Sequence, residues 1–420
     1  MKEVNVSIIT IGDELLIGQT IDTNSAFIGQ ELNKAGAWVK RRVAVGDISA
    51  DIRKALDEET VHADIIILTG GLGPTADDIT KPLLCEYFGG RLVINEEVLA
   101  HVKHLFENVF QRKGALLERN VKQAEVPDVC QVLFNKRGTA PGMLFKKNNK
   151  AYFSLPGVPH EMKGLMTDQV IPWIVKHYQF PAIIHKTLLT AGTGESVIAE
   201  LLTEFESSLP THIRLAYLPN YGMVKLRLTG RSPFAEILEK ELTAQFLKLQ
   251  QLVKEYLVWD ADESLEIVIS KILIGRKKSL GAAESCTGGY ISHLLTSVPG
   301  SSAYYKGSII AYDDEVKKNV LGVKQSTLSA FGAVSAETVK EMVNGTLRTF
   351  KTDYALATSG IMGPGGGSEL KPVGSVWIAV GNKEKTEVLQ LHLRFDRQRN
   401  IITTASIALN FLRKFILTNS

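Results

Sequence analysis

Two β-rich runs that each end in a glycine turn constrain the fold of this chain most strongly. They cover residues 4–11 and 64–69, and both read as buried strands that feed loops. Between them, residues 24–35 carry apolar side chains at a helical spacing. Because strands that alternate with helices are typical of a parallel α/β sheet, we predict a doubly wound first domain over residues 1–178.

The rest of the chain divides into two further parts. Residues 179–258 read as a strand, a helix, two strands and a long helix, which predicts a small α+β connecting module to which we assign no chemistry. Residues 259–420 contain further strand-like runs and end in a helix at 400–417, which predicts a second α/β domain. The predicted fold class is therefore two α/β domains with mainly parallel sheets, joined by the module.

Charge and cysteine content exclude several classes of protein. The 48 basic and 45 acidic residues leave a net charge of +3 without long blocks of either sign, so we expect neither nucleic acid nor a membrane as a partner. The three cysteines are far apart and include no C-x-x-C pair. The longest uncharged stretch, residues 285–305, is rich in Gly, Ser and Thr and fails as a membrane span, and no signal-peptide pattern opens the chain. We expect a cytoplasmic protein that binds small molecules.

A glycine-rich loop after the second buried run is the first candidate site. Glycines allow backbone N–H groups to approach an anion closely, which suits phosphate. The loop lacks the lysine of a P-loop and does not match G-x-G-x-x-G. The predicted phosphate-binding residues are Gly70, Gly71, Gly73 and Thr75.

Four carboxylates accompany this loop. Asp13 and Glu14 end the first strand-like run, and Asp77 and Asp78 follow the glycines. Divalent cations that bridge phosphates prefer carboxylate oxygens, so these four residues are candidate metal ligands. The alternative is that Asp77 and Asp78 cap a helix while Asp13 and Glu14 are solvated turn residues.

The second candidate site begins at Ser285 and Cys286. They follow a short strand and open a helix, where backbone N–H groups can stabilise an oxyanion, and either side chain could be a nucleophile. The segment is not a G-x-S-x-G elbow, and no histidine and acid are placed for a triad. A serine still needs a base, and a desolvated lysine can serve.

Tyr312 and Lys317 are the candidate partners of that nucleophile. Tyr312 ends the strand-like run 308–312, and Lys317 lies in the first turn of a predicted helix opened by two aspartates. A serine with a tyrosine and a lysine is chemically coherent. The alternative is that Tyr312 is a core aromatic residue and Lys317 a solvated surface residue.

Glycines and arginines complete this second site. Residues 358–367 are dense in glycine, which permits close backbone approach to a ligand. Arg394, Arg397 and Arg399 crowd the start of the last helix, where a guanidinium suits a phosphate. Surface solubility is the alternative interpretation of these arginines.

The first half of the chain resembles the amino-terminal domain of the CinA family, which is similar to the molybdopterin-binding fold. The resemblance implies a nucleotide pyrophosphatase that acts on ADP-ribose and requires a divalent metal, Mg²⁺ or similar. It would place the four carboxylates near the metal and the phosphates. The matching motifs lie at residues 9–19, 22–24, 70–80, 138–142 and 155–159.

The last third resembles the CinA carboxy-terminal domain, at residues 283–289, 299–302, 312–317, 332–335, 359–367 and 371–374. The resemblance implies a nicotinamide mononucleotide deamidase that forms nicotinate mononucleotide and ammonia, needs no metal and is a homodimer. It implies that Ser285 attacks the carboxamide, that Lys317 with Tyr312 accepts and relays its proton, and that water hydrolyses an acyl-enzyme.

The resemblance also implies a substrate-binding set. Ser359 and the glycines of its loop would hold the ring end of the ligand, and Arg399, with Arg397, the phosphate. The predicted binding residues are Gly288, Gly289, Ser359, Gly360, Gly363, Arg397 and Arg399. Two positions depart from the family pattern: Met362 stands where alanine is common, and Phe395 where glycine is usual.

The leading interpretation is an enzyme of pyridine nucleotide salvage with two hydrolytic activities. One alternative is a non-catalytic regulatory protein that binds a pterin or a nucleotide. Another is a cysteine amidase that uses Cys286 as its nucleophile.

Overall fold

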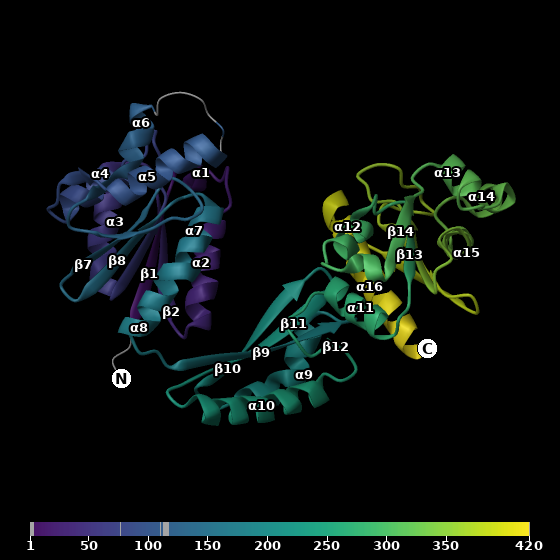
Figure 1. The fold of residues 1–420 in the computed structure, drawn as a ribbon. Helices are drawn as coiled ribbons and strands as arrows, with labels where there is room; N and C mark the ends of the chain where they lie inside the picture. The colour runs from purple at the N-terminus through teal and green to yellow at the C-terminus, as the bar shows by residue number, and fades with distance from the viewer. Residues whose placement is uncertain (1–3, 76, 110, 112–116, 420) are drawn as a thin grey trace. The chain divides into compact units, whose positions relative to one another are not determined.

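The computed structural model describes residues 4–75, 77–109, 111 and 117–419. The chain divides into two compact units (Figure 1). The first unit comprises residues 1–183 with 231–238, and the second comprises 184–230 with 239–420. The second unit thus contains the sheets of both the predicted module and the predicted last domain.

The first unit is built on a sheet whose central strands run parallel. The strand order is β2-β1-β3-β8-β7-β6, in which β1, β2, β3 and β8 are parallel and β7 and β6 are antiparallel. β3 is buried along its whole length, as expected of a parallel strand covered on both faces. The strands of the unit are β1 (Asn5–Ile11), β2 (Trp38–Val45), β3 (Ile65–Thr69), β6 (Gln131–Leu133), β7 (Gly142–Lys147) and β8 (Lys150–Leu155), with β4 (Leu92–Ile94) and β5 (Glu125–Pro127) as a separate antiparallel pair.

Helices cover both faces of this sheet (Figure 1). On one face, α2 (Thr23–Lys34) packs with α7 (Pro159–Leu165), and on the other α3 (Ser49–His62) packs with α4 (Thr80–Tyr87). The predicted parallel α/β fold is confirmed. The other helical segments described are α1 (Asp13–Leu16), α5 (Glu96–His104), η1 (Leu105–Val109), α6 (Glu118–Val121), η2 (Lys122–Ala124), η3 (Met166–Val170) and α8 (Ile171–His177).

The connecting module has a sheet of order β10-β11-β9-β12. Apolar side chains of α9 and α10 pack against this sheet and form a core of their own. The predicted strands and helices of the module are present. Their bounds are β9 (Ala182–Ala191), α9 (Glu195–Ser207), β10 (Ile213–Asn220), β11 (Met223–Ser232), α10 (Ala235–Leu252) and β12 (Leu257–Trp259).

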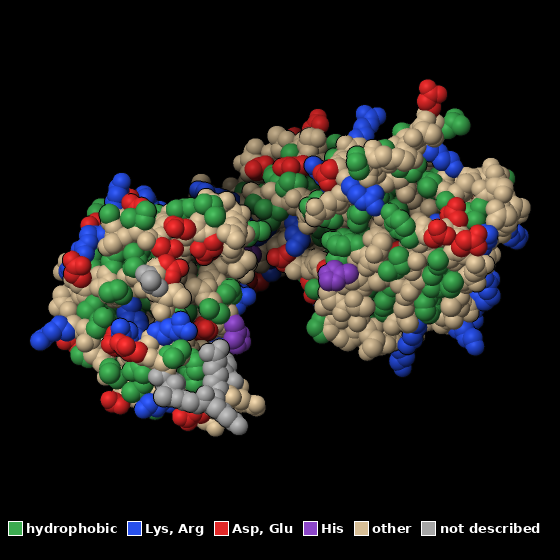
Figure 2. All heavy atoms as spheres, turned by 90° about the horizontal axis from the view of Figure 1, so that it is seen from above, with side chains coloured by type: hydrophobic (Ala, Val, Ile, Leu, Met, Phe, Trp, Pro, Cys, Tyr) green, Lys and Arg blue, Asp and Glu red, His purple; other side chains and the backbone are tan. Residues whose placement is uncertain are grey.

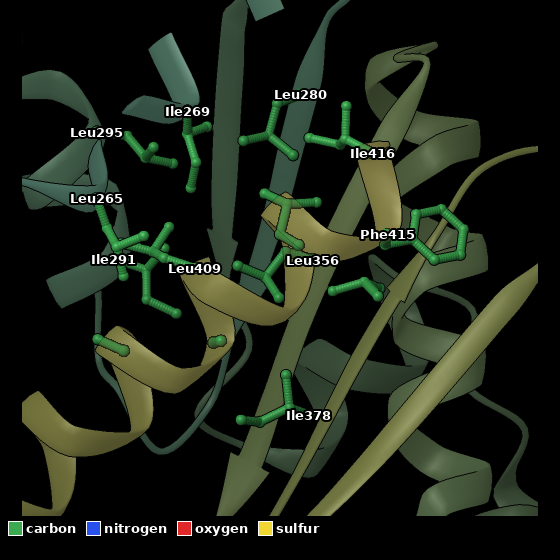
Figure 3. Packing of buried hydrophobic residues seen from close by; sticks show 14 of the residues in the cluster. Leu265, Ile269, Leu280, Ile291, Leu295, Leu356, Ile378, Leu409, Phe415 and Ile416 are labelled. Atoms are coloured by element: carbon green, nitrogen blue, oxygen red, sulfur yellow. The ribbon is translucent and has the colours of Figure 1, made fainter. Parts of the chain in front are cut away.

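The last sheet has the order β14-β13-β15-β16-β17. β13 lies parallel to β14 and β15, whereas β16 and β17 are antiparallel. Helices α11, α12 and α16 cover one face (Figure 3). Helices α14 and α15 cover the other. The bounds are α11 (Leu265–Gly275), β13 (Leu280–Glu284), α12 (Tyr290–Thr296), η4 (Ser301–Ala303), β14 (Tyr305–Ile310), α13 (Asp314–Asn319), α14 (Gln325–Phe331), α15 (Ala336–Phe350), β15 (Tyr354–Gly360), β16 (Ser375–Gly381), β17 (Thr386–His392) and α16 (Arg397–Thr418).

One element of this sheet differs from the sequence prediction. The strand expected at 308–312 is β14, which ends at Ile310, so Tyr312 lies two residues beyond it. The physical reason is the pairing with β13, whose last residue, Glu284, is opposite Ile310. Beyond that point β14 has no partner on this side, and the chain turns into α13.

α16 is the helix, among the described residues, that is long and apolar enough to cross a membrane by length and composition. Half of its most apolar window is buried inside the protein. Leu409, Phe415 and Ile416 pack against residues of α11, α12 and the sheet (Figure 3). Packing in the core therefore accounts for the apolar character of this helix.

Candidate functional site

Ser285 lies at the carboxyl end of β13 and lines a cavity of about 220 Å³. Its N–H donates to the carbonyl of Thr358 in β15 at 3.0 Å, so the backbone of the nucleophile position is fixed against the neighbouring parallel strand. Ligands bind at such strand ends in open α/β sheets. The residues that line the cavity are Ser285, Cys286, Tyr312, Asp314, Lys317, Ala333, Val334, Ser359, Gly360, Met362 and Arg397.

Lys317 reaches this cavity from the first turns of α13, which the side chain of Asp313 caps. Its side chain is only 2% exposed. The ammonium donates to Asp314 Oδ1 at 3.0 Å and to the carbonyl of Tyr312 at 3.2 Å. The alternative of a solvated surface lysine is therefore wrong.

Tyr312 stands at the mouth of the same cavity. It is 60% exposed, so the alternative of a core aromatic residue is wrong. Its hydroxyl accepts a hydrogen bond from Arg397 Nη2 at 3.0 Å, and Arg397 Nη1 donates to the carbonyl of Gly363 at 2.9 Å. One guanidinium thus joins the tyrosine to the glycine-rich loop.

Cys286 is buried beside Ser285. Burial raises the pKa of its thiol to about 12, and a hydrogen bond from Thr358 opposes this only in part. The thiolate is the nucleophilic form of cysteine, and at neutral pH this thiol is protonated. The environment therefore favours the serine over the cysteine as nucleophile.

The loop after Ser285 turns through two glycines with left-handed backbones, Gly288 at φ 59° and Gly289 at φ 98°. These N–H groups do not all remain free for a ligand. The N–H groups of Gly289, Ile291 and Ser292 donate to the carboxylate of Glu284. Within the fully described stretch 285–293, the N–H groups of Cys286 and Thr287 are the two that donate to no other residue of the protein.

The predicted binding residues distribute over more than one cavity. Ser359 and Gly360 line the Ser285 cavity, and the buried Ser359 hydroxyl donates to the carbonyl of Ala333 at 2.7 Å. Gly288 and Gly289 line a second cavity of about 660 Å³, which shares Arg397 with the first. Gly363 contributes its carbonyl to Arg397.

The structure does not bring Arg399 to the Ser285 cavity. Arg399 lines a third cavity, of about 480 Å³, together with residues of the connecting module, and its guanidinium carbon lies 4.0 Å from the centre of the Phe395 ring. Residues two apart on a helix of 3.6 residues per turn point in nearly opposite directions, which explains why Arg397 and Arg399 separate. Of the two departures from the family pattern, Met362 lines the Ser285 cavity, whereas Phe395 is absent from its lining.

Asn400 is a supporting residue that sequence reasoning missed. Its buried amide donates to the carbonyls of Met362 at 3.1 Å and Phe395 at 2.9 Å, and accepts from the N–H of Phe395 at 3.3 Å. It therefore ties the cavity loop to the start of α16. Asn400 follows Arg397, Gln398 and Arg399 in the sequence, so the local pattern gave no signal that it is buried.

At the predicted phosphate loop of the first unit, Gly70 and Gly71 have positive φ angles of 119° and 66°. Asp78 closes the loop, because its carboxylate accepts from the N–H groups of Gly73 at 2.8 Å and Thr75 at 2.9 Å and from the Thr75 hydroxyl. α4 begins at Thr80 without a side-chain cap, so the alternative that these aspartates cap a helix is wrong. Ala76, within the same motif, lies outside the described residues.

Four other carboxylates face one another at this end of the first unit. Asp13 and Asp47 are joined by reciprocal backbone hydrogen bonds of 3.1 and 3.2 Å. Burial raises the pKa of Asp47, and the negative charges of Asp13, Glu14 and Asp77 raise it further, whereas the N–H of Asp13 lowers it. Figure 2 shows acidic side chains grouped on the surface of this unit. Sequence reasoning missed Asp47, although it follows a strand end.

These carboxylates have the oxygen donors that Mg²⁺ prefers. Among the residues that the structure describes, however, no three Asp, Glu, His or Cys side chains converge closely enough to hold a metal ion as they stand. Asp78 accepts more hydrogen bonds than Asp13 and Asp47 do: it accepts two N–H groups and the Thr75 hydroxyl within the loop, whereas Asp13 and Asp47 each accept one N–H from the other. A small cavity of about 120 Å³, lined in part by Glu14, Asn24 and Thr69, lies at the same sheet end.

Fold and sites together define a modular α/β protein with two separate candidate sites, each at the carboxyl ends of parallel strands. Three family models match it: "Probable molybdopterin binding domain" over residues 7–176, "Damage-inducible protein CinA KH domain" over 185–258 and "CinA C-terminal domain" over 262–416.

Relatives of similar length confirm the family. The chain is 46% identical over 412 residues to a CinA-like protein of Cytophaga hutchinsonii, with 98% of each chain covered, and 44% identical over 417 residues to one of Flavobacterium psychrophilum, with 99% of each covered. The protein belongs to the CinA family, and its first domain is of the molybdopterin-binding type.

Solved structures align with parts of the chain. A competence/damage inducible protein from Agrobacterium tumefaciens is 35% identical and covers 35% of this chain and 91% of its own, with a TM-score of 0.35. A CinA protein from Thermoplasma acidophilum is 35% identical and covers 41% of this chain and 99% of its own, with a TM-score of 0.37.

Proposed function

We propose that the carboxy-terminal domain hydrolyses the carboxamide of nicotinamide mononucleotide to nicotinate mononucleotide and ammonia. The observation that carries this proposal is the convergence of Ser285, Tyr312 and the buried Lys317 on one small cavity. A hydroxyl beside a buried amine provides a nucleophile and a base without a metal or a histidine. The proposal names no cofactor for this domain.

In the proposed mechanism, Ser285 Oγ attacks the carboxamide carbon. Lys317 Nζ, once it has given up the proton it shares with Asp314, accepts the serine proton directly or through the Tyr312 hydroxyl. The N–H groups of Cys286 and Thr287 stabilise the negative oxygen of the tetrahedral intermediate. The same proton then moves to the leaving nitrogen, ammonia departs, and water hydrolyses the serine ester to nicotinate mononucleotide and free Ser285.

The surrounding side chains suit an aromatic amide. Because the single proton of the Ser359 hydroxyl is donated to Ala333, this oxygen can only accept a hydrogen bond from a ligand, and the carboxamide NH₂ can supply one. Met362 forms an apolar wall for the ring. We assign the phosphate to Arg397 in preference to Arg399, because Arg397 lines both the first and second cavities whereas Arg399 lines the third.

The test measures ammonia release from nicotinamide mononucleotide in excess chelator. Wild type and Ser285→Ala are compared, with Ser297→Ala, an exposed serine at the end of α12, as the matched control. We expect release by the wild type and the control and none by Ser285→Ala. Folded wild-type protein that releases no ammonia would refute the proposal.

We propose a second, metal-dependent activity for the first unit, the hydrolysis of ADP-ribose at its pyrophosphate. It rests on a glycine-rich loop beside facing carboxylates. When bound, a divalent cation would supply charge neutralisation for the phosphates. Asp13, Glu14, Asp47 and Asp77 are its candidate ligands and would have to draw closer together to hold it, while Asp78 keeps the loop closed. Release of AMP from ADP-ribose that stops with chelator tests this, and nucleotide binding without AMP release favours the non-catalytic regulatory alternative.

Both proposed substrates are free nucleotides, so we propose a cytoplasmic enzyme of pyridine nucleotide salvage. We also propose the homodimer that the family resemblance implies. Analytical ultracentrifugation tests the second point, because a dimer sediments with twice the chain mass of 46.1 kDa.

A further inference from the structure

The carboxylate of Glu284, next to the proposed nucleophile, has no role in the chemistry described above. We propose that Glu284 is a positioning residue, which holds the loop 285–292 in the shape that aims Ser285 at its substrate and leaves the N–H groups of Cys286 and Thr287 free. This inference rests on the proposed amide hydrolysis.

The loop wraps around this carboxylate, which is only 1% exposed. One oxygen accepts from the Thr287 hydroxyl at 2.8 Å and from the N–H groups of Gly289 at 3.1 Å and Ile291 at 3.0 Å. The other oxygen accepts from the N–H of Ser292 at 2.8 Å and from its hydroxyl. Five donors from four residues therefore converge on one side chain.

Charge explains why these donors are held firmly. Among the ion pairs of the described residues, none includes Glu284. A buried carboxylate without a cation must obtain its stabilisation from hydrogen bonds, and bonds to an ionised acceptor are stronger than neutral ones. Displacing the loop from this arrangement would leave the charge buried and unsatisfied.

The position of the carboxylate links this stability to the proposed chemistry. Glu284 is the last residue of β13, and Ser285 follows it directly with its N–H bound to Thr358 in β15. The strand fixes the loop at one end and the carboxylate fixes it at the other. Because Glu284 occupies the N–H groups at the start of α12, the amides of Cys286 and Thr287 are left to bind an oxyanion.

The hydrogen-bond network continues beyond the loop, so variants at increasing distance from Ser285 along the network can be compared. The Tyr305 hydroxyl donates to Ser292 Oγ at 2.8 Å, and Ser292 donates to Glu284. Removing Glu284 should therefore affect Ser285 most, removing the Ser292 hydroxyl less, and removing the Tyr305 hydroxyl least. A residue that only stabilises the fold would not produce this order in a catalytic constant.

The experiment measures kcat and KM for nicotinamide mononucleotide in Glu284→Gln, Ser292→Ala and Tyr305→Phe. We expect Glu284→Gln to lower kcat by about 10- to 100-fold with KM nearly unchanged, since misplacement of a reacting group by about 1 Å costs up to about 100-fold in rate. The rate at which a fluorophosphonate probe labels Ser285, followed by mass spectrometry, should fall in parallel.

The matched control is Glu59→Gln in the first unit. Glu59 is also a fully buried carboxylate, which accepts from the Ser7 hydroxyl at 2.6 Å and pairs with Arg41 at 2.9 Å. We expect this variant to lower the melting temperature without changing kcat for ammonia release.

Each outcome decides the proposal. If Glu284→Gln loses thermal stability but keeps kcat and the labelling rate, its role is structural and the inference is wrong. If Glu284→Gln does not fold, an unchanged kcat in Ser292→Ala overturns it instead. If the wild type labels at Ser285 but releases no ammonia, the proposed function fails, and the labelling rates alone decide the positioning role. If the wild type neither labels at Ser285 nor releases ammonia, the proposed function and the positioning role are both wrong.

Discussion

The charged side chains at the carboxyl ends of the strands differ between the two units in how many hydrogen-bond and ion-pair partners the protein provides for them. At the end of β13, Glu284 accepts five hydrogen bonds, and the buried Lys317 is bonded to Asp314 and to a carbonyl. At the end of β1, Asp13 and Asp47 face each other and the charge of Asp77, and burial with these charges raises the pKa of Asp47.

This difference separates two ways of building a site. In the second unit each charged group has partners within the chain: Glu284 accepts hydrogen bonds from its loop, and Lys317 is paired with Asp314. In the first unit like charges face one another, and a divalent cation would relieve their repulsion. A buried lysine alone does not distinguish the units, because Lys81 of the first unit is also buried, at 7% exposed against 1% for Lys317. What distinguishes Lys317 is the cavity it shares with a hydroxyl.

Replacing the lysine of the cavity should have the largest effect. We expect Lys317→Met to lower kcat for ammonia release by about 10²- to 10⁴-fold, the usual contribution of a general base. Lys318→Met is the matched control, because Lys318 is the neighbouring lysine and is paired with Glu315 at the surface. Equal activity of the two variants would remove Lys317 from the mechanism.

Lys81 should affect stability and leave ammonia release unchanged. Burial lowers its pKa from 10.5 to about 8, and its ammonium donates to the carbonyls of Lys122 and Gln123. The folded-state pKa lies below the unfolded-state value, so the unfolded chain binds more protons between about pH 8 and 10.5. The free energy of unfolding should therefore rise with pH across this window, by up to roughly 3 kcal/mol.

Comparing Lys81→Met with wild type isolates the contribution of Lys81 to the pH dependence of the free energy of unfolding. Denaturant unfolding from about pH 7.5 to 10 should show a difference in free energy between the two proteins that changes with pH. A background with Phe at Trp259 and Trp377 restricts the fluorescence signal to the first unit, which contains Trp38 and Trp173. A constant difference would mean that Lys81 does not titrate as described.

The facing carboxylates should affect only the first unit. We expect Asp47→Asn to weaken Mn²⁺ binding, measured by calorimetry, by at least about 10-fold, since losing even an outer-shell partner of a metal site typically costs about 10- to 100-fold in affinity. Asp57→Asn, on α3 and bonded to Tyr87, is the control. Ammonia release should be the same in both variants. Unchanged Mn²⁺ affinity in Asp47→Asn would exclude this sheet end as a metal site.

The buried thiol beside the nucleophile should matter least. Because burial raises the pKa of Cys286 to about 12, the thiolate fraction is negligible at neutral pH and grows only as the pH approaches that value. We expect iodoacetamide near pH 7.5 not to inactivate the enzyme, and Cys286→Ala to keep kcat within about threefold. An inactive Cys286→Ala together with an active Ser285→Ala would establish the cysteine amidase instead.

Local patterns predicted much of the fold. The expected strand 4–11 and helix 24–35 correspond to β1 and α2, and Lys317 lies in the helix that the aspartates open. These elements depend on the spacing of apolar residues and on capping residues, and both can be recognised from neighbouring positions in the sequence. The alternative interpretations, a core Tyr312 and a solvated Lys317, were wrong because the exposure of a side chain depends on contacts between distant segments, which a local pattern does not contain.

What the sequence did not reveal depends on contacts between distant segments. Asp47 meets Asp13 because β2, a mostly exposed edge strand that the apolar pattern did not indicate, pairs with β1. Arg397 and Arg399 look equivalent in sequence, and only the direction of each side chain on α16 separates them. The five bonds to Glu284 likewise require the loop to fold back over its own strand.

The protonated state of Cys286 also bears on tolerance to oxidants. Peroxide converts a thiolate to a sulfenic acid, and enzymes that attack with sulfur lose their nucleophile by this reaction. A chain whose proposed nucleophile is an oxygen beside a sulfur held as the unreactive thiol avoids that loss. The deamidation that we propose at Ser285 should therefore continue under peroxide stress that stops thiolate-dependent amidases.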